Sequence, residues 1–99
     1  MIIVTGTAVA ASDDALPALM AASLEHVQRS RTEPGCLSHA VHQDVENPRR
    51  LVFLERWADL DALRAHFAVP ASGAFVTAVR RLTTEATTME IYSAEVASP

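Results

Sequence analysis

The stretch that decides the fold is CLSHAVHQDVENPRRLVFLERW, residues 36–57. Two extended runs, 36–45 and 50–58, flank Glu46-Asn47-Pro48-Arg49, a short polar segment rich in turn-forming residues. This pattern predicts an antiparallel hairpin. The second run contains Leu51-Val52-Phe53-Leu54, and successive residues of a strand point to opposite faces of its sheet. A strand that is apolar on both faces needs cover on both faces.

A strand and a helix are expected before the hairpin. Residues 2–10 start with β-branched and apolar side chains, which predicts the first strand. Apolar residues then recur at three- and four-residue steps over 16–27, the pattern of an amphipathic helix. Either Asp13 or Asp14 is the expected N-cap of this helix, and Glu33-Pro34-Gly35 is expected to end it.

A second helical region and a last strand are expected after the hairpin. Asp59 is a good N-cap for a helix that carries Leu63 on its apolar face. Pro70 interrupts this helix, and a further helical segment is expected over 71–82. Residues 89–96 alternate between apolar and polar side chains, which predicts the last strand.

The order β-α-β-β-α-β predicts one α+β domain over residues 1–99, a ferredoxin-like fold. In this arrangement a four-stranded antiparallel sheet carries both helices on one face. The other face is then bare, although the strand over 50–58 is apolar on that side too. A second copy of the chain would cover the bare face, and twofold homodimers are the commonest such assembly. We therefore expect a homodimer.

Composition narrows the range of partners and compartments. The formal charge is -4, from 12 acidic residues against eight arginines scattered along the chain, with no lysine. Nucleic acid is not an expected partner, because phosphate binding needs a basic face. Cys36 is the only cysteine, which excludes an intrachain disulfide and fits a reducing cytoplasm. The apolar start, residues 1–4, is too short for a targeting signal or a membrane span.

The hairpin and the helix after it carry a more specific set of residues. The set consists of Glu33-Pro34-Gly35-Cys36-Leu37, His42-Gln43-Asp44, Asn47-Pro48, Glu55-Arg56-Trp57, Leu63 and His66. In order and spacing it resembles the antibiotic biosynthesis monooxygenase (ABM) family. The most specific part is Glu-x-Trp followed nine residues later by histidine.

The resemblance implies a dimeric α+β barrel. Some members of that family oxidise quinols or anthrones with molecular oxygen and no metal or flavin, whereas others degrade haem or handle small signalling molecules. Haem-degrading members use an asparagine on the first strand, but the only asparagine here is Asn47, in the hairpin. The chain departs from the family at His39, at Leu54 and at Ala71-Ser72-Gly73, where members often have an aromatic residue, a tyrosine and a histidine.

His66 is the candidate catalytic base. Oxidation without a cofactor needs a group near neutral pKa that takes a proton from the substrate, and histidine suits that role. On a helix, His66 would lie at the margin of the apolar face and look into a cleft between helix and sheet. The alternative is that His66 only makes a hydrogen bond at the helix end.

Glu55 and Trp57 should share one face of their strand with Leu51 and Phe53, because they are two residues apart. Two explanations are open for a carboxylate on an apolar face. Either an arginine across the dimer pairs with it, with Arg49, Arg50 and Arg56 as candidates, or it is a pocket carboxylate with a raised pKa.

The remaining candidates are substrate contacts. Trp57 is expected in the pocket wall or the core, and the other proposed contacts are Phe67, Phe75, Tyr92 and His42. His39 and His42 are three apart on a strand and point to opposite faces, so one metal ion cannot bind both. No metal or other cofactor is expected.

Two functions follow from these observations. The first is a cofactor-independent monooxygenase that oxidises a small aromatic or quinol-like molecule, with His66 as base. The second is a non-catalytic or stress-related module that binds a small hydrophobic molecule.

Overall fold

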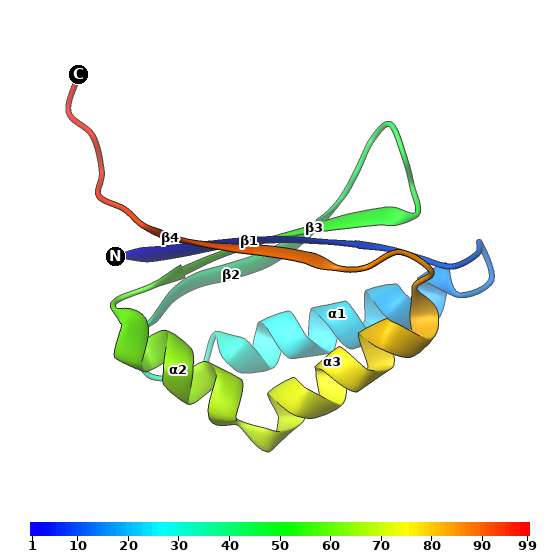
Figure 1. Cartoon of the computed structure of the whole chain (residues 1–99), viewed down its shortest axis with the longest axis horizontal. Helices are drawn as coiled ribbons and strands as arrows, with labels where there is room; N and C mark the ends of the chain where they lie inside the picture. The colour runs from blue at the N-terminus through cyan, green and yellow to red at the C-terminus, as the bar shows by residue number, and fades with distance from the viewer.

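A computed structural model describes residues 1–99 as a four-stranded antiparallel sheet with helices on one face (Figure 1). In chain order the elements are β1 (Ile2–Val9), α1 (Leu16–Ser30), β2 (Cys36–Gln43), β3 (Arg50–Trp57), α2 (Leu60–Ala68), α3 (Pro70–Leu82) and β4 (Thr88–Ser93). The strand order in the sheet is β2-β3-β1-β4. This is the predicted α+β, ferredoxin-like arrangement, with the second helical region divided into α2 and α3.

The sheet register sets which side chains share the helix-covered face. β1 and β3 run antiparallel with Val4 opposite Glu55, and β2 and β3 pair with His39 opposite Glu55. On the other side of β1, Val4 lies opposite Ile91 of β4. Directly opposed residues point the same way, so His39, Glu55 and Val4 form a row beneath the helices.

The predicted cap of the second helical region is confirmed. The Asp59 side chain accepts a hydrogen bond of 2.8 Å from the Ala62 backbone N–H, and α2 starts at the next residue, Leu60. Pro70 then occupies the first turn of α3, where its missing N–H forfeits no helical hydrogen bond. No single helix is long and apolar enough to cross a membrane; only α2 and α3 taken together, bent by 71°, reach that length and composition.

The predicted cap of α1 is wrong. The helix begins at Leu16, and its N-cap residue Ala15 makes no capping bond through its side chain. Asp13 does not cap the helix, because its carboxylate binds the Arg49 guanidinium of the hairpin at 2.8 Å. The backbone N–H of Ala15 instead donates to the Ser12 hydroxyl at 3.1 Å.

Gly35 reverses the chain between α1 and β2. Its φ is +81°, in the left-handed region that favours glycine. A Cβ at this position would lie 2.5 Å from the Cβ of Ala62 on α2. The helix itself ends earlier than the predicted stop, at Ser30. Gly35 therefore serves the turn and the close approach of α2, not the last helical turn.

The core fills the space between the helices and the sheet in two clusters. One surrounds Trp57 and Leu63 and also contains Ile2 and Val4. The larger one is built from Ala8, Ala10, Leu19, Val27, Leu51, Phe53 and Val79. Between them lies a polar region that the apolar clusters do not fill, and it holds the candidate site described below.

β3 is apolar on both faces, as predicted. Leu51 and Phe53 point into the core and are 2% and 8% exposed. Val52 and Leu54 point to the face that no helix covers, and Leu54 is 45% exposed. We call this side of the sheet the open face.

Candidate active site

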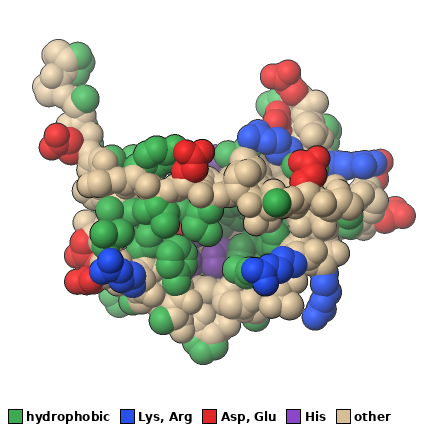
Figure 2. Space-filling model, in the orientation of Figure 1, with side chains coloured by type: hydrophobic (Ala, Val, Ile, Leu, Met, Phe, Trp, Pro, Cys, Tyr) green, Lys and Arg blue, Asp and Glu red, His purple; other side chains and the backbone are tan.

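A cleft of about 120 Å³ opens between the sheet and the helices. Figure 2 shows histidine atoms in this hollow, with hydrophobic side chains on both sides. The polar groups that line it include His26, Glu55 and His66. Most of the remaining wall is apolar and is supplied by β1, β3, β4 and α3 together with Phe67; its larger members are Val4, Phe53, Phe75, Val76, Val79 and Met89.

His66 lies deeper than the sequence indicates. The helical pattern places it at the margin of the apolar face, but with Leu63 it is one of two buried residues of α2, and it is 3% exposed. Its Nδ1 lies 2.8 Å from Glu33 Oε1, in the turn before β2. An ionised carboxylate only accepts hydrogen bonds, so Nδ1 carries the proton and donates it to Glu33. The Nε2 lone pair of a neutral His66 is therefore free.

Glu33 is itself held in place. Its other carboxylate oxygen, Oε2, lies 3.0 Å from Arg29 Nη1 on α1, and its side chain is 14% exposed. The Glu33 carboxylate thus links α1 to α2 through two charge-assisted contacts. Glu33 belongs to the motif that resembles the ABM family, but sequence reasoning gave it no partner.

Glu55 is paired, but with none of the three arginines expected as partners. Trp57 Nε1 donates a 2.9 Å hydrogen bond to Glu55 Oε1, and His39 Nε2 lies 3.2 Å from the same oxygen. Burial alone would raise the pKa of Glu55, but His39 and the Trp57 hydrogen bond together lower it below its ordinary value. Of the two explanations for this carboxylate, the pocket carboxylate with a raised pKa is therefore wrong.

The expected arginine partners of Glu55 point elsewhere. Glu55 lies on the helix-covered face, so an arginine from a second sheet docked on the open face would not reach it. Within the chain, the three candidates bind other groups: Arg49 binds Asp13, Arg50 binds Asp44, and Arg56 binds the Ser38 hydroxyl.

His39 and His42 point to opposite faces of β2, as expected. His39 is opposite Glu55 beneath the helices, whereas His42 is opposite Val52 on the open face. The His39 side chain is fully buried, yet neither of its ring nitrogens has a partner in hydrogen-bond geometry. The 3.2 Å contact with Glu55 is close enough for an ion pair but lies outside that geometry. An unsatisfied buried polar atom costs about 1–3 kcal/mol.

His26 is the site residue that sequence reasoning missed. It lies on α1, is 7% exposed, and accepts a 2.8 Å hydrogen bond at Nδ1 from Arg29 Nη2. Burial, and then the neighbouring His39, His66 and Arg29, lower the pKa of His26 to about 3. A signal was present, because His26 follows the buried residues Leu19 and Ser23 at helical spacing.

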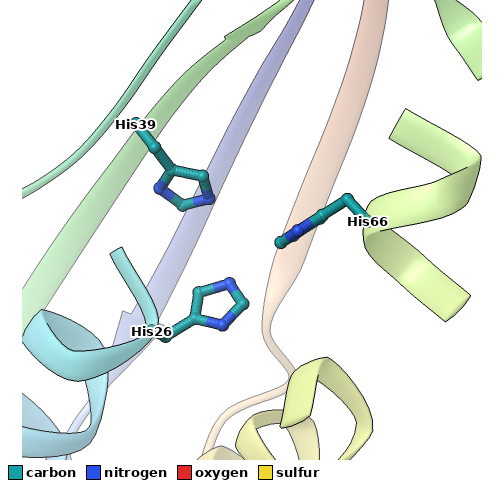
Figure 3. A group of neighbouring side chains, drawn as sticks. All are labelled: His26, His39 and His66. Atoms are coloured by element: carbon teal, nitrogen blue, oxygen red, sulfur yellow. The ribbon is translucent and has the colours of Figure 1, made fainter. Parts of the chain in front are cut away.

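Three buried histidines thus converge from three elements. Figure 3 shows His26 of α1, His39 of β2 and His66 of α2 turned toward a common centre. Their ring centroids are 5.2 to 5.7 Å apart.

The aromatic candidates are divided between the cleft and its surroundings. Phe75 stacks on His26 with ring centroids 4.0 Å apart, and Phe67 lies 5.8 Å from His66; both line the cleft. Trp57 is fully buried behind His66, at a centroid distance of 4.6 Å, and does not line the cleft. It therefore supports His66 and Glu55 from the core.

Tyr92 and His42 do not belong to this cleft. Tyr92 is opposite Ile3 on the open face, and its hydroxyl donates to the Glu90 carboxylate. His42 lies on the same open face. The sequence could not separate these residues from the site, because which face of the sheet the helices cover is a tertiary feature.

The sequence pattern of the antibiotic biosynthesis monooxygenase family matches residues 1–78. The chain belongs to this family.

Relatives of known structure share the whole ABM fold. A Deinococcus radiodurans protein named for the same family is 28% identical and superimposes with a TM-score of 0.92, over 100% of this chain and 97% of that one. A second structure named for the family is 25% identical, with a TM-score of 0.88 over 97% and 100% of the two chains.

Uncharacterized protein sll1783 of Synechocystis is similar in sequence: it is 32% identical over 73 residues, which are 74% of this chain. The chain spans about half the length of that relative.

One departure from the ABM pattern falls on the cleft. Ser72, within Ala71-Ser72-Gly73, lines the cleft, is 6% exposed, and has a hydroxyl with no hydrogen-bond partner. The polar group at this position is thus a small neutral hydroxyl, and the titratable groups that line the cleft come from α1, α2 and β3, with Arg80 from α3.

Proposed function

We propose that this protein is a cofactor-independent monooxygenase that oxidises a small aromatic or quinol-like molecule with O2. The single observation that carries the proposal is the Glu33–His66 pair, 2.8 Å apart, which leaves a histidine lone pair available beside an apolar cleft. Membership of the ABM family supports the reaction class.

The Glu33–His66 pair suits a general base. Glu33 fixes the ring so that Nδ1 carries the proton and Nε2 accepts one. When Nε2 takes a proton from the substrate, the ring becomes a cation, and the Glu33 carboxylate stabilises that charge. Phe67 and Phe75 add apolar rings to the wall of the same space.

The size of the cleft limits the substrate. A cavity of 150 Å³ lined by apolar side chains is known to hold benzene, so about 120 Å³ accommodates roughly one aromatic ring. A larger molecule would place its remaining rings at the mouth. We therefore favour a monocyclic quinol or phenol as substrate.

The reaction balances without an added reductant. His66 Nε2 removes a proton from the phenol or enol, and the resulting anion gives electrons to O2. A carbon–oxygen bond forms, and the proton held by His66 passes to the new hydroperoxide. Loss of water then leaves a carbonyl, so one oxygen atom enters the product and the other leaves as water. The substrate supplies all the electrons.

We also propose that two copies pair through their open faces. Val52 and Leu54 place apolar surface on a side of the sheet that no helix covers. A second sheet laid against them would complete the dimeric α+β barrel expected for the family.

Oxygen uptake tests the monooxygenase with a panel of monocyclic quinols. His66→Gln keeps a polar group next to Glu33 but cannot take the proton, and we expect turnover to fall about 100-fold or more. Glu33→Gln should lower kcat less and leave KM unchanged, because its role is to position and stabilise His66. His42→Gln, on the open face, is the matched control.

Two results would contradict the proposal. Unchanged turnover in His66→Gln would remove this residue from the mechanism. Tight binding of the quinols without oxygen uptake would favour the alternative, a non-catalytic module that binds a small hydrophobic molecule. Thermal unfolding of each variant establishes that lost activity does not reflect lost folding.

A further inference from the structure

The three buried histidines form a compact set of nitrogen donors. His26, His39 and His66 each offer one ring nitrogen, and these three atoms lie within 4.8 Å of one another. All three residues are buried, with 7%, 2% and 3% of their surface exposed. Imidazole nitrogens are the ligands that zinc, copper, nickel and iron ions share.

The unsatisfied ring of His39 is a second observation, independent of the spacing of the three nitrogens, that favours a ligand at this site. Its side chain is completely buried, and neither ring nitrogen has a hydrogen-bond partner. Buried polar atoms are nearly always satisfied by protein, water or ion. A metal ion at the centre of the three rings would satisfy one nitrogen of His39, for which the core offers only the 3.2 Å contact with Glu55, outside hydrogen-bond geometry.

The neighbouring carboxylates have the arrangement of a metal site. A histidine that binds metal commonly gives its other N–H to a carboxylate, which fixes the ring. Glu33 receives the Nδ1 proton of His66, so Nε2 is the nitrogen left for a metal. Glu55, 3.2 Å from His39, adds a negative charge next to the centre. The cleft reaches both His26 and His66, which provides an access route.

We propose that His26, His39 and His66 bind one divalent transition-metal ion of the zinc class, with a fourth coordination position open to the cleft. Three histidines with an open position match zinc sites that keep one position for water or substrate. The ion would occupy the His66 nitrogen that the proposed oxidation uses as base. Metal binding and quinol oxidation would then exclude each other.

Arg29 opposes this binding in a way that can be measured. Its Nη2 donates to His26 Nδ1, which places the ring proton of neutral His26 on Nε2. Binding a metal through Nε2 moves that proton to Nδ1, so Arg29 must release the ring and keep its contact with Glu33. Removing Arg29 should therefore strengthen metal binding.

Calorimetric titration of the full chain with Zn²⁺, after treatment with a chelator, tests the proposal. We expect one ion per chain, and Co²⁺ in its place should give the intense visible absorption of a tetrahedral site. His39→Phe, which keeps a ring in the core, and His66→Gln should each weaken binding about 100-fold, and Glu55→Gln by roughly 10-fold. Arg29→Met should bind more tightly than the parent chain.

His42→Gln is the matched control, because His42 lies on the open face. An affinity that falls in this variant as much as in His39→Phe would overturn the site, as would no binding by a folded parent chain. Unchanged affinity in Arg29→Met would overturn the assignment of His26. The titration measures metal binding without turnover, so the two proposals are tested separately. Absence of metal binding would not contradict the proposed oxidation, and absence of oxygen uptake would not contradict the proposed metal site.

Discussion

Individual side chains in this small core are held by partners from distant parts of the chain. The His66 ring depends on Glu33, 33 residues earlier, and the His39 ring of β2 contacts the Glu55 carboxylate of β3. Such pairs decide which tautomer a buried imidazole adopts, and hence which nitrogen faces the cleft. The chemistry of the site is therefore set residue by residue and not by the composition of the pocket.

Replacing glycine with alanine should have opposite effects on stability at positions 35 and 73. Gly35→Ala forces a side chain into the left-handed region and against Ala62, and should destabilise the fold by about 2 kcal/mol or more. Gly73 lies in α3, and apart from its two chain neighbours and the adjacent backbone of its own helix no atom lies within 4 Å of the place that an added methyl group would take, so Gly73→Ala should stabilise by about 0.5–1 kcal/mol. Urea unfolding of both variants measures the difference. Equal effects would show that backbone conformation at Gly35 is not limiting.

Sequence reasoning found His66 and Glu55 of the motif and the cleft residues Phe67 and Phe75, and it missed His26. His66 and Glu55 stood out because the spacing of Glu-x-Trp and histidine is specific. His26 stands outside that motif, and a histidine within an amphipathic helix is not distinguished from its neighbours by type. The contacts of Arg29 and Glu33 with the rings depend on how α1 meets α2, which no local pattern encodes.

Among the helices and strands, α2 carries the candidate base and is only nine residues long. A helix this short depends on its ends, because isolated helices of this length are marginal in water. The Asp59 side chain supplies the N-terminal end by accepting from Ala62. The placement of His66 therefore depends on a cap seven residues earlier in the chain.

Asp59→Ala should cost about 1 kcal/mol through loss of this cap. For a domain of this size that corresponds to a fall in Tm of about 4–8 °C, measured by circular dichroism. Asp61→Ala is the matched control, since the Asp61 side chain is 92% exposed and caps nothing. A similar loss in both variants would mean that negative charge near the helix start matters, and not the capping bond.

The hairpin was predicted closely because turn formers and β-branched residues act locally. The ends of elements were less accurate: β2 stops at Gln43 and β4 at Ser93, before the predicted limits. The predicted N-cap of α1 was wrong because the Asp13 carboxylate binds Arg49, and only the folded chain brings these two residues together. Local patterns thus specify which elements form and, at Asp59, where one begins, whereas a long-range contact overrides the local signal at Asp13.

In the proposed dimer, a second copy of the chain covers the open face of the sheet. Leu54→Arg would place a charge within the proposed interface, where burying it without a partner is unfavourable. We expect a monomeric mass by light scattering for this variant and a dimeric mass for the parent chain. Leu60→Arg, at a helix position of similar exposure, should stay dimeric.

A parent chain that is monomeric at micromolar concentration would contradict the proposed dimer. A Leu60→Arg variant that dissociates as readily as Leu54→Arg would place the interface elsewhere. The four-stranded sheet and the cleft beneath it would remain in either case, because both lie within one chain.

The only tryptophan of the chain, Trp57, is fully buried with its ring 4.6 Å from His66. Its fluorescence should therefore have the blue-shifted emission of a dry indole. An occupant of the cleft would change the intensity by quenching. The molecule thus contains a native optical reporter, and events at its centre can be followed in real time without attaching a dye.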